Sequence, residues 1–253
     1  NKISKYMLKN GYECRIMGIP KTVDNDLYGT DHSPGYGSAA KYIATTAMEI
    51  YLDAKVYDTG MVTVLEIMGR HAGWLTAASG IATYYGMGPD LIYLPEIPFD
   101  KDTFLADVQK VYEKEGKCII AISEGISDAS GKLMVEKFAE GSDVTRDSFG
   151  HAQLGGIGVT LADIIKDKLG CKTRGIEFSL MQRCAAHCAS STDVAESILA
   201  GQKAVEFAVG GITDKMVGFK CSRENGYKCE IELFDLVSVA NAEKKVPREW
   251  INR

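Results

Sequence analysis

Two carboxylates and a lysine lie within seven consecutive residues near the start of the chain. Residues 20–26 read Pro-Lys-Thr-Val-Asp-Asn-Asp and follow an apolar segment, residues 16–19, which predicts a buried strand running into a loop. One carboxylate there is suited to accept a proton, the other to hold a hydrated metal ion, and the lysine to neutralise an anion. This combination favours phosphoryl transfer. The alternative is a solvated turn, because Asp and Asn are common turn formers.

Composition excludes several classes of protein. The chain has 253 residues, 45% of them hydrophobic and 25% charged, which is typical of a globular protein with one large or two modest domains. The net charge of -5 offers no basic surface, so nucleic acid and anionic membranes are not expected partners. No apolar run is long enough to cross a bilayer. Seven scattered cysteines indicate reduced thiols and a cytoplasmic location.

Strands and helices are expected to alternate along most of the chain. Apolar and β-branched runs predict the buried strands, and periodic apolar faces predict the helices. The expected strands are residues 16–19, 62–68, 91–94, 118–123 and 175–180, and the expected helices are residues 1–10, a long helix after residue 35, and residues 102–115, 157–169 and 192–208. Near the end, residues 216–221 and 228–234 flank Asn225-Gly226, which predicts a hairpin. The alternation favours mostly parallel sheets covered by helices.

Polar side chains follow four of the expected strands. They are the loop at residues 21–26, Gly69-Arg70, Glu124 and Gln182-Arg183. The carboxyl ends of parallel strands meet at one edge of a sheet, so we expect these loops to converge on one cleft. Carboxylates and cations together would suit a phosphorylated ligand that also carries hydroxyl groups.

Together these motifs resemble the phosphofructokinase family. The matching segments are residues 20–26, Met68-Gly69-Arg70, residues 122–124 and Gln182-Arg183, in the order of the family and over nearly the whole chain. The amino-acid sequences of residues 181–187 and 240–247 resemble those of the pyrophosphate-using bacterial branch. The resemblance implies two three-layer α/β/α domains with mostly parallel sheets, the first of them incomplete. Residues 1–34 and 183–253 would form the first, donor-side domain, and residues 35–182 the second, sugar-phosphate-side domain.

The resemblance also implies roles for the residues of the first loop. Asp24 corresponds to the general base that takes the proton from the 1-hydroxyl of fructose 6-phosphate, and Thr22 would lie against the sugar or the transferred group. Asp26 would help to hold Mg²⁺ through water. Lys21 stands where ATP-using bacterial members carry glycine, and its ammonium can occupy the space that the α-phosphate of ATP needs. Pyrophosphate is therefore the expected donor and ATP the alternative.

On the sugar side, Met68 and Gly69 would shape the pocket and Arg70 would stabilise the moving phosphoryl group. Glu124 would accept hydrogen bonds from sugar hydroxyls. Arg183 and Arg174 would bind the 6-phosphate, Arg174 from a neighbouring subunit of a homo-oligomer, either a dimer or a tetramer.

Two departures from the family pattern concern the 6-phosphate. Leu180 stands where ATP-using bacterial relatives have a histidine, and Met61 stands where an arginine is expected. Either the 6-phosphate is held differently in this branch, or that part of the mapping is wrong.

In the family, a segment upstream of these motifs supplies a glycine-rich phosphate loop and a direct magnesium ligand. We interpret the chain as a fragment, so by itself it is expected to show little or no phosphotransferase activity.

Two other functions stay open: a non-catalytic regulatory subunit that binds sugar phosphate, and a generic sugar- or nucleotide-binding module. Two local patterns also invite a site. Cys184, His187 and Cys188 would share a helical face but lack a fourth zinc ligand. The glycines of residues 150–158 precede a helix that could bind phosphate, although a tight turn with close helix packing is the favoured interpretation.

Overall fold

The computed structural model describes residues 2–56, 58, 60–138 and 156–252. Contacts group the chain into two compact units, which are described separately. Unit 1 comprises Asn1–Ala39 and His187–Lys244, and unit 2 comprises Ala40–Ala186 and Lys245–Arg253. The domain boundaries expected from the sequence stay a prediction. Among the described residues, none of the helices has the length and apolar character needed to cross a membrane.

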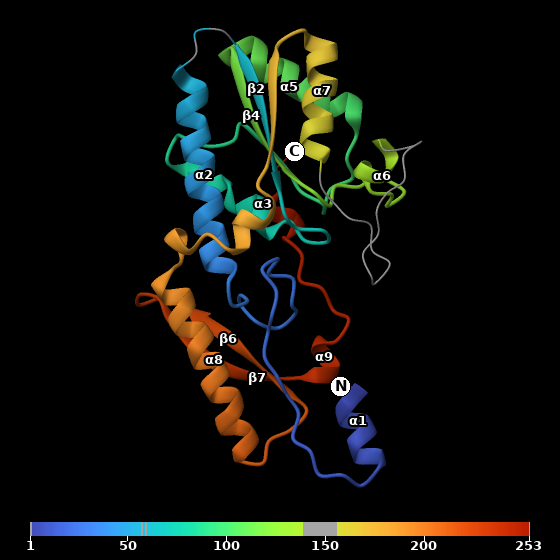
Figure 1. Ribbon diagram of the computed structural model, residues 1–253, viewed down its shortest axis with the longest axis vertical. Helices are drawn as coiled ribbons and strands as arrows, with labels where there is room; N and C mark the ends of the chain where they lie inside the picture. The colour runs from blue at the N-terminus through green and yellow to red at the C-terminus, as the bar shows by residue number, and fades with distance from the viewer. Residues whose placement is uncertain (1, 57, 59, 139–155, 253) are drawn as a thin grey trace. The chain divides into compact units, whose positions relative to one another are not determined.

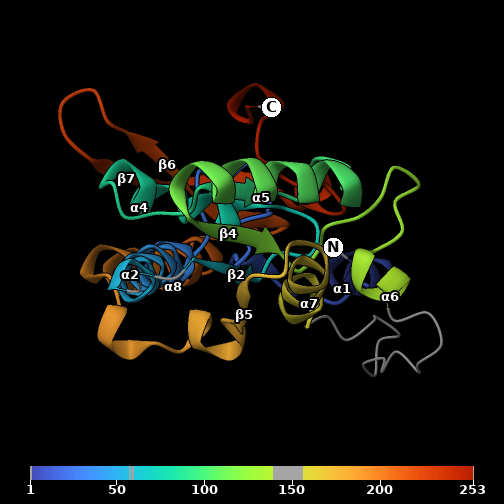
Figure 2. The same ribbon diagram turned by 90° about the horizontal axis from the view of Figure 1, so that it is seen from above.

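Unit 2 is built on a four-stranded parallel sheet in the order β3-β4-β2-β5. Helix α5 covers one face of this sheet, and α2 and α7 lie on the other (Figure 2). The strands are β2 (Met61–Ile67), β3 (Leu91–Tyr93), β4 (Lys117–Ser123) and β5 (Lys172–Glu177). The helices are α2 (Tyr36–Val56), which begins in unit 1, α3 (Trp74–Ala78), α4 (Gly80–Tyr84), α5 (Lys101–Glu115), α6 (Met134–Phe138) and α7 (Ile157–Leu169), with 3-10 turns η1 (Ser179–Arg183) and η3 (Arg248–Trp250).

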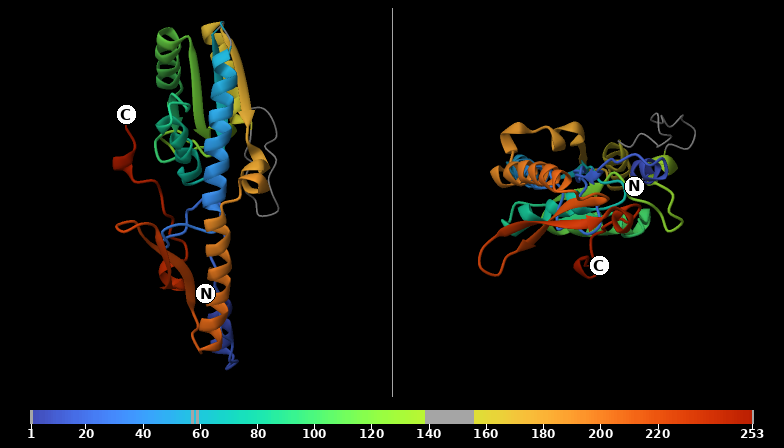
Figure 3. Two further views of the ribbon diagram at one scale, coloured as in Figure 1. Left: turned by 90° about the vertical axis from the view of Figure 1, so that its left-hand side faces the viewer. Right: turned by 90° about the horizontal axis from the view of Figure 1, so that it is seen from below.

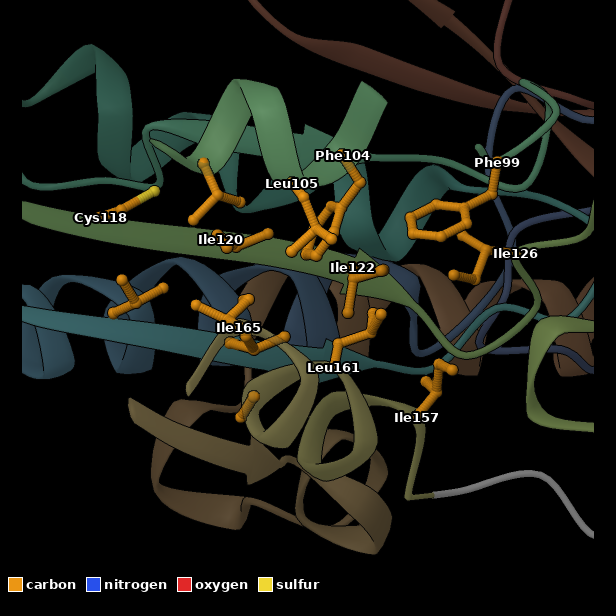
Figure 4. Packing of buried hydrophobic residues seen from close by; sticks show 14 of the residues in the cluster. Phe99, Phe104, Leu105, Cys118, Ile120, Ile122, Ile126, Ile157, Leu161 and Ile165 are labelled. Atoms are coloured by element: carbon orange, nitrogen blue, oxygen red, sulfur yellow. The ribbon is translucent and has the colours of Figure 1, made fainter. Parts of the chain in front are cut away.

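The core of unit 2 follows from the burial of its two central strands. Every residue of β2 is buried, as is every residue of β4 after Lys117. Phe104 of α5, Ile120 of β4 and Leu161 of α7 are fully buried in one apolar cluster (Figure 4). Because both faces of the sheet are covered, these strands read as continuous apolar runs, which is why the sequence predicted them correctly.

Local signals fix the ends of the helices. The Asp100 carboxylate accepts a hydrogen bond from the Thr103 N–H at 2.8 Å and caps α5. Gly116 ends the same helix with a left-handed φ of 68°. Gly156 and Gly170 flank α7, both with positive φ. The helices predicted over residues 102–115 and 157–169 are therefore confirmed.

Unit 1 contains a three-stranded mixed sheet in the order β1-β6-β7. Strands β6 and β7 form the antiparallel hairpin predicted around Asn225-Gly226, while β1 pairs with β6 in parallel. Helix α8 lies along this sheet (Figure 3). The elements are α1 (Lys2–Lys9), β1 (Met17–Gly18), α8 (Ser191–Val209), β6 (Lys215–Ser222), β7 (Lys228–Asp235) and α9 (Leu236–Val239), and the 3-10 turn η2 (Ala186–Cys188) precedes α8 (Figure 1).

Two predicted strands need correction. The buried strand expected over residues 16–19 is only the pair Met17–Gly18, and it is half-buried because it lies at the edge of its sheet. The strand expected over residues 175–180 lies earlier, as β5, and ends at Glu177. Ser179 then adopts a left-handed φ of 46°, which breaks the extended chain and starts the turn η1.

The fold is thus α/β, with one parallel and one mixed sheet. Unit 2 has the three expected layers. For unit 1 the three-layer arrangement stays a prediction.

Candidate active site

Three of the four polar segments meet at the carboxyl edge of the parallel sheet in unit 2. Strands β2 and β4 run in register, with Ile67 opposite Ser123, so the residues after both strands emerge together. The Glu124 N–H donates to the Ile67 carbonyl at 2.9 Å. In return, the Gly69 N–H donates to the Glu124 carboxylate at 3.3 Å. Glu124 is therefore oriented by the segment that carries Arg70.

Two glycines allow these loops to lie against each other. Gly69 has a φ of 133°, and a Cβ there would stand 2.6 Å from the Ala72 carbonyl oxygen. A Cβ on Gly125 would stand only 2.0 Å from the Arg70 carbonyl oxygen. The Ser123 hydroxyl also donates to the Gly69 carbonyl. Backbone contacts this close leave no space for a side chain at either glycine.

Gln182 joins the third segment to the first. Its Oε1 accepts a hydrogen bond from the Met68 N–H at 3.0 Å, and its Nε2 donates to the Ser179 carbonyl at 3.1 Å. The residue is only 2% exposed. Arg183 follows directly and is exposed. The motif pair therefore has two parts: a buried amide that ties the turn η1 to Met68, and the exposed Arg183 that follows it directly in the chain.

Arg174 lies elsewhere in unit 2. It sits within β5 in register with Thr63 of β2, four residues before the end of that strand. Its guanidinium forms an ion pair with Asp53 of α2 at 3.7 Å. Within one chain it is thus placed along the edge strand, and its expected contact with a neighbouring subunit's substrate stays a prediction.

The loop of residues 21–26 lies in unit 1, where it is shaped by its own polar groups. The Asp24 N–H donates to the Thr22 hydroxyl at 3.1 Å, so this hydroxyl orients the loop. Asn25 adopts a left-handed φ of 58° and is 2% exposed; its Oδ1 accepts a hydrogen bond from the Ser33 N–H at 3.0 Å. Asp24 and Asp26, on either side of Asn25, are half-buried.

Lys244 supports this loop, a role that the sequence did not reveal. Its ammonium donates to the Asn25 Oδ1 at 3.2 Å, the Thr30 carbonyl at 3.0 Å and the Asp31 carbonyl at 2.7 Å. Its backbone N–H donates to the Asp26 carbonyl at 2.7 Å. Burial lowers the pKa of Lys244 to about 8. The only signal in the sequence was the lysine pair in residues 240–247, which carries no information about a partner more than 200 residues away.

Carboxylates in unit 1 offer the oxygen donors that a hard cation prefers. Asp26 and Glu243 line one pocket of this unit. These residue types fit Mg²⁺, which binds through carboxylate oxygens and water. The direct ligand that the resemblance implies upstream of these motifs stays a prediction.

Glu66 is a buried carboxylate that sequence analysis missed. It lies on β2, 2% exposed, and its Oε2 accepts the Gly158 N–H at 2.8 Å at the start of α7. Burial raises its pKa to about 7, and the nearby carboxylates of Glu177 and Glu124 add to the rise. A Cβ on Gly158 would come within 3.0 Å of Glu66, so the interpretation of this glycine as a close-packing residue is confirmed. The helix start already engages a carboxylate of its own chain; residues 150–155 of the glycine-rich pattern lie outside the described residues.

The shared helical face expected for Cys184, His187 and Cys188 is not formed. Cys184 follows the turn η1 and donates its thiol hydrogen to the Leu180 carbonyl at 3.0 Å. His187 and Cys188 belong to the separate turn η2, in which His187 is exposed and Cys188 buried. The local chain is too irregular to align the three side chains.

Comparison with known proteins follows the same motifs. The sequence is 43% identical over 253 residues to the pyrophosphate–fructose 6-phosphate 1-phosphotransferase of Halomonas elongata, covering 99% of this chain and 59% of that protein. It is 33% identical over 253 residues to the sulfofructose kinase of Alkalicoccus urumqiensis, covering 95% of this chain and 64% of that protein. The crystal structure of the pyrophosphate-dependent phosphofructokinase from Nitrosospira multiformis superposes with a TM-score of 0.85 at 37% identity, covering 99% of this chain and 59% of that one.

The chain therefore spans about three-fifths of the length of these relatives. The family model for Phosphofructokinase matches residues 2–207, a range that includes the loop of residues 21–26, the strand ends of unit 2 and the Gln182-Arg183 turn. With this match, and with a fold like that of a pyrophosphate-dependent enzyme, the chain belongs to the phosphofructokinase family.

Proposed function

We propose that the complete protein transfers a phosphoryl group from pyrophosphate to the 1-hydroxyl of fructose 6-phosphate, reversibly and with Mg²⁺. The observation that carries this proposal is the hydrogen-bonded edge of unit 2. There the Gly69 N–H meets the Glu124 carboxylate, and the Met68 N–H meets the Gln182 amide. This edge holds one carboxylate, that of Glu124, which can accept hydrogen bonds from hydroxyl groups, and it carries two arginines, Arg70 and Arg183, in the segments that it joins. A sugar phosphate offers the matching groups.

Each residue of this edge has a proposed task. Glu124, which the Gly69 N–H holds at this edge, accepts a hydrogen bond from a sugar hydroxyl. Arg183 binds the 6-phosphate, with Arg174 of a neighbouring subunit in a homo-oligomer. Arg70 stabilises charge on the phosphoryl group in transit, because a planar guanidinium suits phosphate oxygens.

The loop of residues 21–26 supplies the chemistry on the donor side. Asp24 accepts the proton of the 1-hydroxyl as the sugar oxygen forms its bond to phosphorus and the bridging P–O bond of pyrophosphate breaks, releasing phosphate. A carboxylate of ordinary basicity is sufficient, because the proton moves as the new bond forms. When bound through water by Asp26, Mg²⁺ neutralises phosphate charge. Lys21 contacts the transferred phosphoryl group and takes the space of an ATP α-phosphate.

A second acceptor deserves a test because two expected cations for the 6-phosphate are absent. Met61 is 2% exposed within β2 and cannot reach a ligand without leaving the core, and Leu180 is an exposed apolar side chain. A sulfonate carries less negative charge than a phosphate and needs fewer cations. One relative is named sulfofructose kinase, so phosphorylation of a sulfonated fructose is the alternative acceptor reaction.

The experiment is a donor-by-acceptor comparison with the complete protein. Pyrophosphate and ATP are each offered with fructose 6-phosphate and with sulfofructose, and the phosphorylated products are measured. The proposal expects the highest kcat/KM for pyrophosphate with fructose 6-phosphate, and a specific loss of pyrophosphate use in Lys21→Gly. A preference for ATP or for sulfofructose would contradict it. Binding of fructose 6-phosphate without turnover from either donor would instead identify a regulatory subunit.

A further inference from the structure

A second cluster of polar side chains lies in unit 1, where the segment that follows the loop of residues 21–26 runs along β6. Residues 30–32 run along β6: the Asp31 N–H donates to the Phe219 carbonyl at 2.8 Å, and the Phe219 N–H donates to the Thr30 hydroxyl at 2.9 Å. The ring of His32 stacks on Phe219 with centroids 4.7 Å apart. This pairing places the side chains of residues 31 and 32 beside the far end of the hairpin.

Three side chains there direct metal-ligand atoms at one another. Asp31 Oδ1 lies 3.1 Å from His32 Nδ1, and Cys221 Sγ lies 3.7 Å from the same nitrogen. All three atoms lie within 4.8 Å of one another, the only such group of His, Cys, Asp and Glu found among the described residues. Donor atoms gathered this closely can ligate one ion with small side-chain rotations.

Cys229 lies outside this group of three but next to it, so that a rotation of its side chain would bring its thiol to the group as a fourth donor. It lies directly opposite Cys221 in the antiparallel pair β6–β7. Side chains of directly opposed residues project from the same face of the sheet, with Cβ atoms about 5 Å apart.

The buried carboxylate of Glu196 orients this cluster. The residue is 7% exposed; its Oε2 lies 2.8 Å from His32 Nε2, and its Oε1 accepts the Tyr227 hydroxyl at 2.6 Å. When the neutral ring of His32 carries its proton on Nε2 and donates it to Glu196, the Nδ1 lone pair faces Asp31 and Cys221, as ligation of an ion requires. Metal-binding histidines have this arrangement, with a carboxylate on the nitrogen remote from the ion.

We propose that unit 1 binds a zinc-class divalent cation through His32 Nδ1, the thiolates of Cys221 and Cys229, and the Asp31 carboxylate. Nitrogen and sulfur donors in fourfold coordination select this class over Mg²⁺, which requires oxygen donors. Two thiolates and a carboxylate exceed the charge of the ion by one. The guanidinium of Arg223, 3.3 Å from Asp31 Oδ1, offsets the excess. The ion would tie residues 31 and 32, at the end of the loop that Lys244 supports, to the hairpin.

The test is a cobalt titration of the complete, reduced protein in the presence of excess Mg²⁺. We expect one Co²⁺ per chain with thiolate-to-metal charge-transfer absorption, and displacement of the cobalt by an equal amount of Zn²⁺. Cys221→Ser and Cys229→Ser should each weaken or abolish this absorption. The matched control is Cys14→Ser, a half-exposed cysteine of the same unit, which should leave it unchanged.

A second measurement guards against variants that fail to fold. In the wild-type protein, Zn²⁺ should slow alkylation of Cys221 and Cys229 at least tenfold, as seen by mass spectrometry, while Cys14 reacts at its metal-free rate. The proposal is overturned by reduced protein that shows no thiolate absorption with Co²⁺. It is equally overturned by unchanged alkylation rates, or by thiolate absorption that persists in both serine variants.

Discussion

Replacing Gln182 with leucine tests whether its buried amide holds the segment of residues 68–70 in place. Leucine keeps the approximate volume of the side chain but cannot accept the Met68 N–H or donate to the Ser179 carbonyl, which the glutamine engages at 3.0 and 3.1 Å. Ser179 is exposed, so water can replace one of these bonds. Met68 is half-buried, so leaving its N–H without the glutamine acceptor should lower the stability of this segment by about 1–3 kcal/mol.

The effect should be local. A loss of about 2 kcal/mol corresponds to roughly 30-fold more frequent opening of the segment that carries Met68, Gly69 and Arg70. Hydrogen exchange of the complete protein, followed on the peptide that contains these residues, measures this directly. In parallel, KM for fructose 6-phosphate should rise, because Arg70 and Arg183 lose their common anchor.

Two further variants sharpen this experiment. Gln182→Glu keeps an acceptor for the Met68 N–H and should retain more of the protection than leucine does. Gln109→Leu removes an exposed amide that donates to Glu113 on α5, and it should change stability by no more than about 0.5 kcal/mol. Unchanged exchange at residues 68–70 together with unchanged substrate KM in Gln182→Leu would contradict the anchoring role of the Gln182 amide.

Three other perturbations probe the remaining contacts. Gly125→Ala places a Cβ 2.0 Å from the Arg70 carbonyl oxygen, so thermal unfolding should show that the free energy of unfolding falls by about 1–3 kcal/mol or more. The control, Gly201→Ala in α8, has open space around it and should be neutral or stabilising. Equal stability of the two variants would contradict the tight contact. The pKa of Glu66 is raised from 4.5 to about 7, so ionisation of this group should remove up to about 3 kcal/mol of wild-type stability as the pH rises from 4.5 through 7. Glu66→Gln should abolish that part of the pH dependence in denaturant unfolding. An identical dependence of stability on pH in both proteins would contradict the raised pKa. Lys244→Met removes three hydrogen bonds to residues 25–31, so kcat should fall about 10–100-fold with little change in fructose 6-phosphate binding. The control, Lys220→Met, removes an exposed ion pair with Glu232 and should leave kcat unchanged.

The parts of the fold that could be predicted are those decided by neighbours in the sequence. β2 and β4 read as unbroken apolar runs because both faces of their sheet are covered. Helix α7 was predicted at its observed bounds because glycines flank an amphipathic segment. β5 was displaced in the prediction because its apolar residues continue into Phe178, beyond the left-handed Ser179 that changes the chain direction.

The candidate site was predictable where its polar residues directly follow the ends of parallel strands. The convergence of residues 68–70, Glu124 and Gln182 follows from parallel register, and the structure confirms it within unit 2. The supporting groups were not predictable. Lys244 and Glu66 act through contacts with residues far away in the chain, and a lysine in a polar segment or one acid in an apolar strand gives no local sign of its partner.

The proposed phosphoryl transfer is tested most directly by the substitution Asp24→Asn in the complete protein. The substitution keeps the size of the side chain and removes only its capacity to accept the proton. Fructose 1,6-bisphosphate formation from pyrophosphate should fall about 10²–10⁴-fold, while calorimetry shows fructose 6-phosphate bound with nearly the wild-type Kd. Turnover within a few-fold of the wild-type rate would contradict the role of Asp24 as the base, and with it the proposed phosphoryl transfer.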